Sequence, residues 1–211
     1  MRTPIGIMVA GLLSCLVPVA KADVVYQVTV NTGSISGTAG SLDFNFNPGP
    51  TGVVQAASAD VFNFGGTGTL TGAPSLTGDV SGVLPATVTL DNGTGFNDYF
   101  VGFTYGSSLS FDVELSGPAV NSPDGVSTSG SMFAFSMFSD SAGTVPVLTT
   151  DTTDGYAITI SVNLDGSTTL TNYSQETTGS PLAPVPEPSS LALLGVGLLG
   201  LAVTNRRKRT A

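Results

Sequence analysis

The segment YAITISVNLDGSTTLTNY, residues 156–173, carries the clearest structural signal in the chain. In its first half, apolar residues alternate with small or polar ones, so one face of a strand would hold Tyr156, Ile158, Ile160, Val162 and Leu164. This period of two is typical of a half-buried β-strand. The Asp165-Gly166 pair then predicts a turn, after which the chain returns as the partner strand of a hairpin.

Two turn lengths are compatible with this hairpin, and they give different registers. A two-residue turn would place Leu170 on the polar face, whereas a three-residue loop with a bulge at Gly166 would set Leu170 beside Ile160. We favour the three-residue loop, because it keeps Leu170 with the apolar residues of the neighbouring strand.

The same alternation recurs along residues 24–30, 99–105 and 109–115, and further turn signals stand at Asn92-Gly93, Asp124-Gly125 and Asp154-Gly155. No window before the C-terminal tail shows a sustained period of 3.6 residues. We therefore expect ten to twelve short strands in an all-β body, residues 23–180. The expected architecture is an antiparallel β-sandwich of jelly-roll type.

The charges of the chain are separated along the sequence. No Lys, Arg or His lies between Ala22 and Asn205, whereas 14 of the 15 acidic residues lie on the body. Each carboxylate there must be solvated, hydrogen-bonded to uncharged groups, or held by a bound cation. Nucleic acid is excluded as a partner, because binding to phosphates depends on Lys and Arg.

The same composition excludes most kinds of catalytic site. The chain has no His, and its one Cys, Cys15, lies in the N-terminal segment, so Ser-His-Asp, Cys-His and zinc sites are absent from the body. A pair of carboxylates is the remaining option. Asp112 and Glu114 lie on one strand face, opposite Phe111 and Val113, and we interpret both as solvent-exposed rather than catalytic. The protein is therefore expected not to be an enzyme.

Calcium is the one metal whose oxygen ligands this body supplies. Asp91, Asn92, Asn97 and Asp98 gather in a glycine-containing loop and are the candidate ligands. Their spacing differs from that of the D-x-[DN]-x-[DN]-G loop, and turn formation by Asp and Asn explains the cluster equally well without metal. Both interpretations stay open from the sequence.

The N-terminal residues 1–22 have the three regions of a secretory signal peptide. Arg2 is followed by an apolar stretch at residues 5–19 and by the small-x-small triplet Ala20-Lys21-Ala22, which predicts cleavage before Asp23. A lipoprotein signal ending at Cys15 is a second interpretation. It fits less well, because apolar residues rather than a polar linker follow this cysteine.

The C-terminus contains three consecutive parts. Residues 181–188 hold four prolines and predict an extended spacer. Residues 189–204, with an apolar run from Leu191 to Val203, would span about 24 Å as a helix, which is short for the ~30 Å core of a bilayer, so we expect a marginal transmembrane segment. Residues 205–211 form a basic tail that would stay on the cytoplasmic side, with its charges on Arg206, Arg207, Lys208 and Arg209.

This order of parts, Val-Pro-Glu-Pro-Ser-Ser, then a Leu/Gly-rich segment, then an Arg-rich end, closely resembles the PEP-CTERM sorting signal of Gram-negative bacteria. The resemblance implies that exosortase, a membrane-embedded cysteine transpeptidase, recognises Pro186, Glu187 and Pro188 and cuts the chain nearby. Residues 41–50, 91–100 and 129–155 also resemble the bodies of a group of PEP-CTERM proteins with no assigned molecular function. That second resemblance supports the fold and implies no active site.

The sequence thus predicts an exported protein, anchored transiently in the inner membrane with its body outside the cytoplasm. By the resemblance to PEP-CTERM proteins, the body then passes to the cell surface or the exopolysaccharide matrix. The alternative is a module that binds carbohydrate, here exopolysaccharide, with or without the help of calcium. Exosortase and the membrane are the expected partners in sorting.

Overall fold

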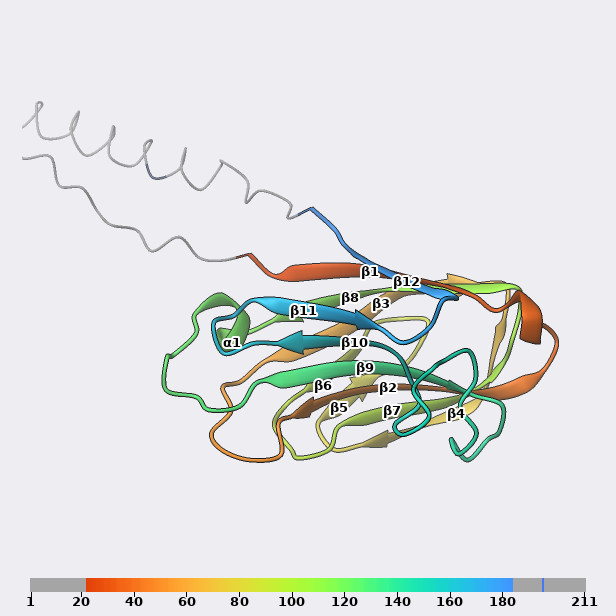
Figure 1. The fold of residues 1–211 in the computed structure, drawn as a ribbon, viewed down its shortest axis with the longest axis horizontal. Coiled ribbons are helices and arrows are strands. Elements are labelled where there is room, and N and C mark those ends of the chain that lie inside the picture. Colours follow the sequence, from red (N-terminus) through yellow and green to blue (C-terminus); the bar gives the residue numbers. More distant parts are fainter. Residues whose placement is uncertain (1–21, 184–194, 196–211) are drawn as a thin grey trace, which may run out of the picture.

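Twelve strands form two six-stranded antiparallel sheets in the computed structural model, which describes residues 22–183 and residue 195 (Figure 1). Sheet A has the order β12-β1-β8-β3-β6-β5 and contains β1 (Val24–Asn31), β3 (Ser58–Gly66), β5 (Val80–Gly82), β6 (Val88–Asp91), β8 (Ser108–Ser116) and β12 (Thr177–Pro181). Sheet B has the order β11-β10-β9-β2-β7-β4 and contains β2 (Ala39–Pro48), β4 (Thr69–Thr77), β7 (Asp98–Thr104), β9 (Ser131–Phe138), β10 (Tyr156–Val162) and β11 (Thr168–Asn172). The prediction of an all-β body with ten to twelve strands is confirmed.

The described residues contain little helix. A single 3-10 turn, η1 (Gly33–Ile35), follows β1, and a four-residue helix, α1 (Pro118–Asn121), follows β8. In this part of the chain, neither is long and apolar enough to cross a bilayer. The predicted signal peptide, transmembrane segment and basic tail lie outside the described residues, apart from Ala22 and Gly195.

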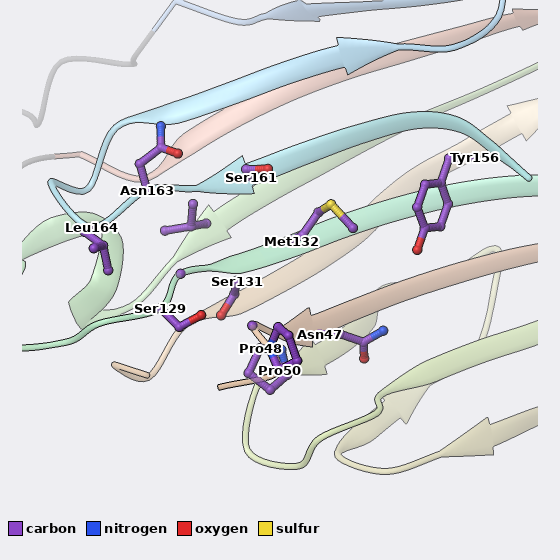
Figure 2. Close-up of a pocket in the computed structure, with 13 residues that line it drawn as sticks. Asn47, Pro48, Pro50, Ser129, Ser131, Met132, Tyr156, Ser161, Asn163 and Leu164 are labelled. Atoms are coloured by element: carbon purple, nitrogen blue, oxygen red, sulfur yellow. The ribbon is translucent and has the colours of Figure 1, made fainter. Parts of the chain in front are cut away.

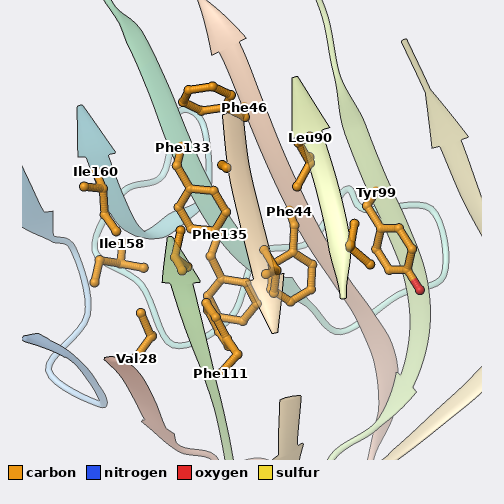
Figure 3. Packing of buried hydrophobic residues seen from close by; sticks show 14 of the residues in the cluster. Val28, Phe44, Phe46, Leu90, Tyr99, Phe111, Phe133, Phe135, Ile158 and Ile160 are labelled. Carbon is orange, nitrogen blue, oxygen red and sulfur yellow. The ribbon is translucent and has the colours of Figure 1, made fainter. Parts of the chain in front are cut away.

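Aromatic side chains fill the space between the two sheets (Figure 3). The ring of Phe44 on β2 lies 5.1 Å from that of Phe111 on β8 and 4.9 Å from that of Phe135 on β9, measured between centroids. Phe111 belongs to sheet A and the other two to sheet B, so the sheets pack face to face as a β-sandwich. Alternation explains this core, because every second residue of these strands points inward.

The hairpin of β10 and β11 has the register expected from the three-residue loop. Leu170 pairs with Ile160, the amide of Gly166 donates to the carbonyl of Asn163 at 2.9 Å, and the amide of Asn163 donates to the carbonyl of Ser167 at 2.8 Å. Gly166 has a φ of 73°, a left-handed conformation that glycine adopts without strain. The predicted bulge is confirmed.

The predicted face of Tyr156 is wrong. The pairing of β10 with β9 shifts between Tyr156, which lies opposite Ser136, and Ile158, which lies opposite Phe135. This bulge inserts Ala157 as an extra residue and turns Tyr156 from the core to the outer face of sheet B. Leu164, expected on the same face as Ile158, lies in the loop and is 50% exposed.

Both ends of the described chain leave the sandwich at one place. β1 and β12 are antiparallel neighbours, with Tyr26 opposite Pro181, and the amide of Leu182 donates to the carbonyl of Val25 at 2.7 Å. The last strand therefore includes Pro181, the first residue of the expected spacer. We call this side of the sandwich the tethered end; it also carries α1 and the loops at 49–57, 92–97, 122–130 and 163–167 (Figure 1).

Candidate functional site

A groove of about 440 Å³ runs along the outer face of sheet B toward the tethered end (Figure 2). It lies over the last residues of β2, the first residues of β9 and the length of β10. Its lining residues are Asn47, Pro48, Gly49, Pro50, Ser129, Gly130, Ser131, Met132, Tyr156, Ser161, Val162, Asn163 and Leu164. Mixed apolar and amide or hydroxyl lining of this kind is common in small-ligand sites.

Hydrogen bonds hold the polar groups of the groove in place. The side-chain nitrogen Nδ2 of Asn163 donates to the hydroxyls of Ser167 and Thr169 at 3.0 and 2.9 Å. Ser131 Oγ accepts from Asn92 Nδ2 at 2.8 Å. At Gly49, a Cβ would lie only 1.7 Å from Ser129 Oγ. The Pro-Gly-Pro rim therefore passes close against the residues that lead into β9, and the amide of Gly49 donates to the carbonyl of Gly130 at 2.8 Å.

A row of polar side chains leads along β2 to the groove. Asp43, Asn45 and Asn47 occupy alternate positions on the outer face, while Phe44 and Phe46 point into the core. Asn47 Nδ2 donates to Asn45 Oδ1 at 3.3 Å, and Asn45 Nδ2 donates to Asp43 Oδ1 at 3.4 Å. Each amide thus orients the next, and the row ends at Asn47 in the groove wall.

At the other end of this row two carboxyl groups meet. Asp43 interacts with Asp98 of the neighbouring strand β7, and burial together with this hydrogen-bonded, like-charged neighbour raises the pKa of Asp43 to about 9. Asp98 Oδ1 is buried and accepts no hydrogen bond from a nitrogen or hydroxyl group of the described residues. A proton on Asp43 relieves the repulsion between the two groups, so Asp43 is neutral at pH 7.

This raised pKa predicts that replacing Asp43 by Asn stabilises the protein at neutral and alkaline pH. The folded state holds a proton that the unfolded state loses above pH 3.8, so the free energy of unfolding falls as the pH rises from about 4 to 9. The introduced side-chain amide would donate to Asp98 without holding a titrating proton. We expect Asp43→Asn to raise the free energy of unfolding by roughly 1–2 kcal/mol at pH 8 and by little at pH 4, measured by urea titration.

Asp140→Asn is the control, because the pKa of Asp140 is shifted in the opposite direction to that of Asp43. The hydroxyl and amide of Thr144 donate to its exposed carboxylate and lower its pKa, so this carboxylate stabilises the fold above pH 3.8 and the contribution is lost in acid. Asp140→Asn should therefore leave stability unchanged or reduce it at pH 8. If Asp43→Asn behaves like Asp140→Asn across the pH range, the shared proton is disproved.

The groove itself suits a neutral, polar ligand. None of its lining residues is charged, and the raised pKa of Tyr156, caused by burial and by the charges of Asp154 and Asp151, keeps the phenol protonated as a hydrogen-bonding group. The Asp43–Asp98 pair does not line the groove. The groove thus offers amide and hydroxyl groups, a phenol ring and apolar edges, and no pair of groups for acid–base catalysis.

The four candidate calcium ligands join neighbouring segments of the sandwich. Asn92 Oδ1 accepts from the amide of Ala57 and Asn97 Oδ1 from the amide of Asp79, at 3.0 and 2.9 Å. Asp91 accepts from the hydroxyl of Ser58, and Asp98 faces Asp43. Within residues 22–183, no three Asp or Glu side chains form a group that could hold a metal. Calcium binding stays a prediction, to be tested by the melting temperature in millimolar calcium.

The predicted exposure of Asp112 is wrong, since only 8% of this residue is accessible to solvent. The pairing of β3 with β8 shifts between Phe62 and Gly65, and Asn63 at this bulge has a φ of 52°. Its Nδ2 donates to Asp112 Oδ2 at 2.8 Å and covers the carboxylate. Glu114 is only partly buried; burial and the charges of Asp23 and Asp60 raise its pKa.

Sequence reasoning missed the groove because its walls come from three distant parts of the chain. The one local signal was the Asn47-Pro-Gly-Pro50 segment, where two prolines interrupt an alternating strand. Alternation predicts Tyr156 on the apolar face of its strand, and Asn163 and Ser131 belong to no motif. Alternation identifies the outer face of a strand but not whether a loop from elsewhere borders it.

The C-terminal tail matches a known family of sorting motifs. Residues 184–208 match the family model of the PEP-CTERM protein-sorting motif. This agrees with the sequence-based identification of a PEP-CTERM domain-containing protein, and it covers Pro186, Glu187, Pro188 and the basic residues Arg206, Arg207 and Lys208. These residues lie outside the described part of the structure. Comparisons with curated proteins and with solved structures found no match for the chain.

The motif indicates export and sorting at the membrane through exosortase. It says nothing of the body, which lies wholly upstream of residue 184. The role of the body therefore has to be argued from its own geometry.

Proposed function

We propose that this protein is a non-catalytic component of the bacterial cell surface or extracellular matrix, released from the inner membrane when exosortase cuts its PEP-CTERM tail. The PEP-CTERM match at residues 184–208 carries this proposal. The composition of the body supports it, since the body has no Cys, His or Lys to serve as nucleophile or base and its net negative charge favours solubility outside the cell.

The proposal is tested by producing the protein in a host with and without its exosortase. With the enzyme, the body should be found outside the inner membrane at a mass reduced by the tail; without it, the uncut chain should stay in the membrane fraction. Release of a shortened body from cells that lack exosortase would contradict the proposal.

A second candidate function is binding of a neutral polysaccharide segment in the groove. The observation that favours it is the lining itself: Asn47, Ser161 and Asn163 supply hydrogen-bonding groups, and Tyr156 supplies a ring for the apolar face of a sugar. An acidic polysaccharide fits less well, because the body contains no Lys, Arg or His to offset its carboxylates.

The order of the strands supports a jelly-roll topology for the sandwich, which is the fold expected from the sequence. We infer that the first eight strands follow a jelly-roll path, with β1-β8-β3-β6 in one sheet facing β2-β7-β4 in the other. β5 pairs with β6 instead of continuing sheet B, and β9 to β12 widen both sheets. Lectin domains are among the proteins with this architecture, although fold alone does not establish a ligand.

Binding in the groove predicts a large effect of replacing Tyr156 by Ala. Loss of the ring should weaken binding of a neutral glycan about tenfold, as measured by calorimetry with a ligand chosen from a glycan array. Phe96→Ala is the matched control, because Phe96 is an exposed aromatic residue outside the groove. Equal affinities of the two variants, or the absence of any neutral ligand on the array, would contradict binding in the groove.

A further inference from the structure

The exposed apolar side chains are distributed unevenly between the two ends of the sandwich. Among the eight large hydrophobic residues exposed in the described part, five lie at the tethered end: Val53, Phe96, Val126, Leu164 and Leu182. Val126 is 72% exposed, Val53 63% and Phe96 54%. The loops at the opposite end, 32–38, 139–155 and 173–176, carry one such residue, Val145.

The loops at the tethered end are hydrogen-bonded to one another, so the residues they carry are held at the same end of the sandwich. Thr128 links two of the loops, because its amide donates to the carbonyl of Val53 at 2.9 Å and its hydroxyl accepts from the amide of Val53 at 3.0 Å. Asn92 donates to the carbonyl of Gln55 at 2.9 Å and joins the loop of Phe96 to the same group. The side chain of Asn121 in α1 donates to Asp23 at 2.7 Å, next to the point where the chain enters β1.

The length of the tail brings this end close to a bilayer. The described body ends at Ala183, and the predicted transmembrane segment begins six residues later, at Ser189. Six residues reach no more than about 20 Å, whatever their conformation. While the tail is uncut, Ala183 at the tethered end is therefore within about 20 Å of the start of the predicted membrane segment.

We propose that, before the tail is cut, the tethered end rests on the outer surface of the membrane, with Val53, Phe96 and Val126 in contact with lipid. This inference rests on the membrane-associated sorting step proposed above. Apolar side chains on linked loops insert at the boundary between headgroups and acyl chains without crossing the bilayer. The nearby carboxylates, such as Asp23 and Asp124, favour a zwitterionic over an anionic lipid surface.

The same orientation has a consequence for the groove, because Asn163 and Leu164 at its end belong to a loop of the tethered end. Contact with the membrane would restrict access to this part of the groove until the tail is cut. Sorting and ligand binding would then occur in sequence.

The absence of Trp from the chain makes a direct test available. Val126→Trp, Phe96→Trp and, as the control at the opposite end, Val145→Trp would each be made in the full-length, uncut protein and inserted into phosphatidylcholine vesicles that contain brominated lipid. We expect the lipid to quench the Trp fluorescence of the first two variants at least about twofold more than that of Val145→Trp. No other protein is present, so contact with a protein partner cannot produce the signal.

Equal quenching at both ends, or stronger quenching of Val145→Trp, would overturn the proposed orientation. Circular dichroism melting shows whether each variant is folded, and Val53→Trp replaces any variant at the tethered end that is not. Vesicle flotation separates this proposal from the sorting step. If the protein floats with the vesicles but is quenched equally at both ends, it is anchored in the membrane without the proposed orientation. If it does not float, the membrane-associated step on which the orientation depends is itself contradicted.

Discussion

Replacing Phe44 by Ala should lower the free energy of unfolding of the body by about 3–5 kcal/mol. Phe44 is 1% exposed, and its ring contacts those of Phe111 and Phe64 from sheet A and of Phe135 and Tyr99 from sheet B. The substitution would leave a cavity where the two sheets meet, and the surrounding rings cannot close it without moving the strands. Urea titration of the purified protein, followed by circular dichroism, measures the loss.

Two further variants test whether the loss of stability comes from the buried position and the volume of the Phe44 ring. Phe96→Ala removes the same side chain from an exposed loop and should change stability by no more than about 0.5 kcal/mol. Phe44→Leu keeps most of the volume and should cost less than half of the Phe44→Ala effect. A loss below about 1 kcal/mol for Phe44→Ala would show that the two sheets do not pack through this ring.

Replacing Pro186-Glu187-Pro188 with three alanines should abolish release of the body and leave the full-length protein in the inner membrane. From the sequence, we expect the two prolines to keep Glu187 out of a helix and so accessible to the sorting enzyme. Alanines would remove the carboxylate and, with their high helix propensity, would no longer prevent helix formation at these positions. Fractionation and immunoblotting with an antibody against the body report both location and size.

Pro184→Ala is the matched control, because it removes a proline from the same spacer outside the Pro-Glu-Pro triplet. This variant should be processed as the unmodified protein is. Normal release of the triple-alanine variant would show that the triplet is not what exosortase recognises, even though the tail matches the PEP-CTERM motif.

The features that could be predicted from the sequence are those encoded by neighbouring residues. The register of β10 and β11 followed from alternation together with one glycine suited to a left-handed turn, and both signals lie within the same hairpin. The sorting motif was recognisable because its three parts are contiguous in the chain.

The features that were missed or wrong depend on pairing with distant residues. Tyr156 is on the outer face because β10 bulges against β9, and Asp112 is buried because a bulge in β3 brings Asn63 over it. A bulge changes the face of every residue beyond it, and the sequence of one strand does not show where its partner will be irregular. The groove was missed for the same reason, since its walls belong to β2, β9 and β10.

The acidic body shows how carboxylates are accommodated where no cationic side chain exists. Asp112 accepts a hydrogen bond from an amide side chain, and Asp124 and Asp140 accept from backbone amides and hydroxyls that lower their pKa. Asp43 instead keeps a proton beside Asp98. The sequence predicted solvation, hydrogen bonding or a bound cation; the shared proton is a further solution that only the pairing of β2 with β7 reveals.

The position of β12 decides how the fold would respond to mechanical load. If the body is held by the matrix while the tail is still in the membrane, tension enters the sandwich through Leu182 and acts on the strand at the edge of sheet A. β12 is paired with β1 from Pro181 back to Thr177, so the backbone pairs next to Tyr26 would bear this force first. Cutting the tail would therefore also relieve β12 of the load.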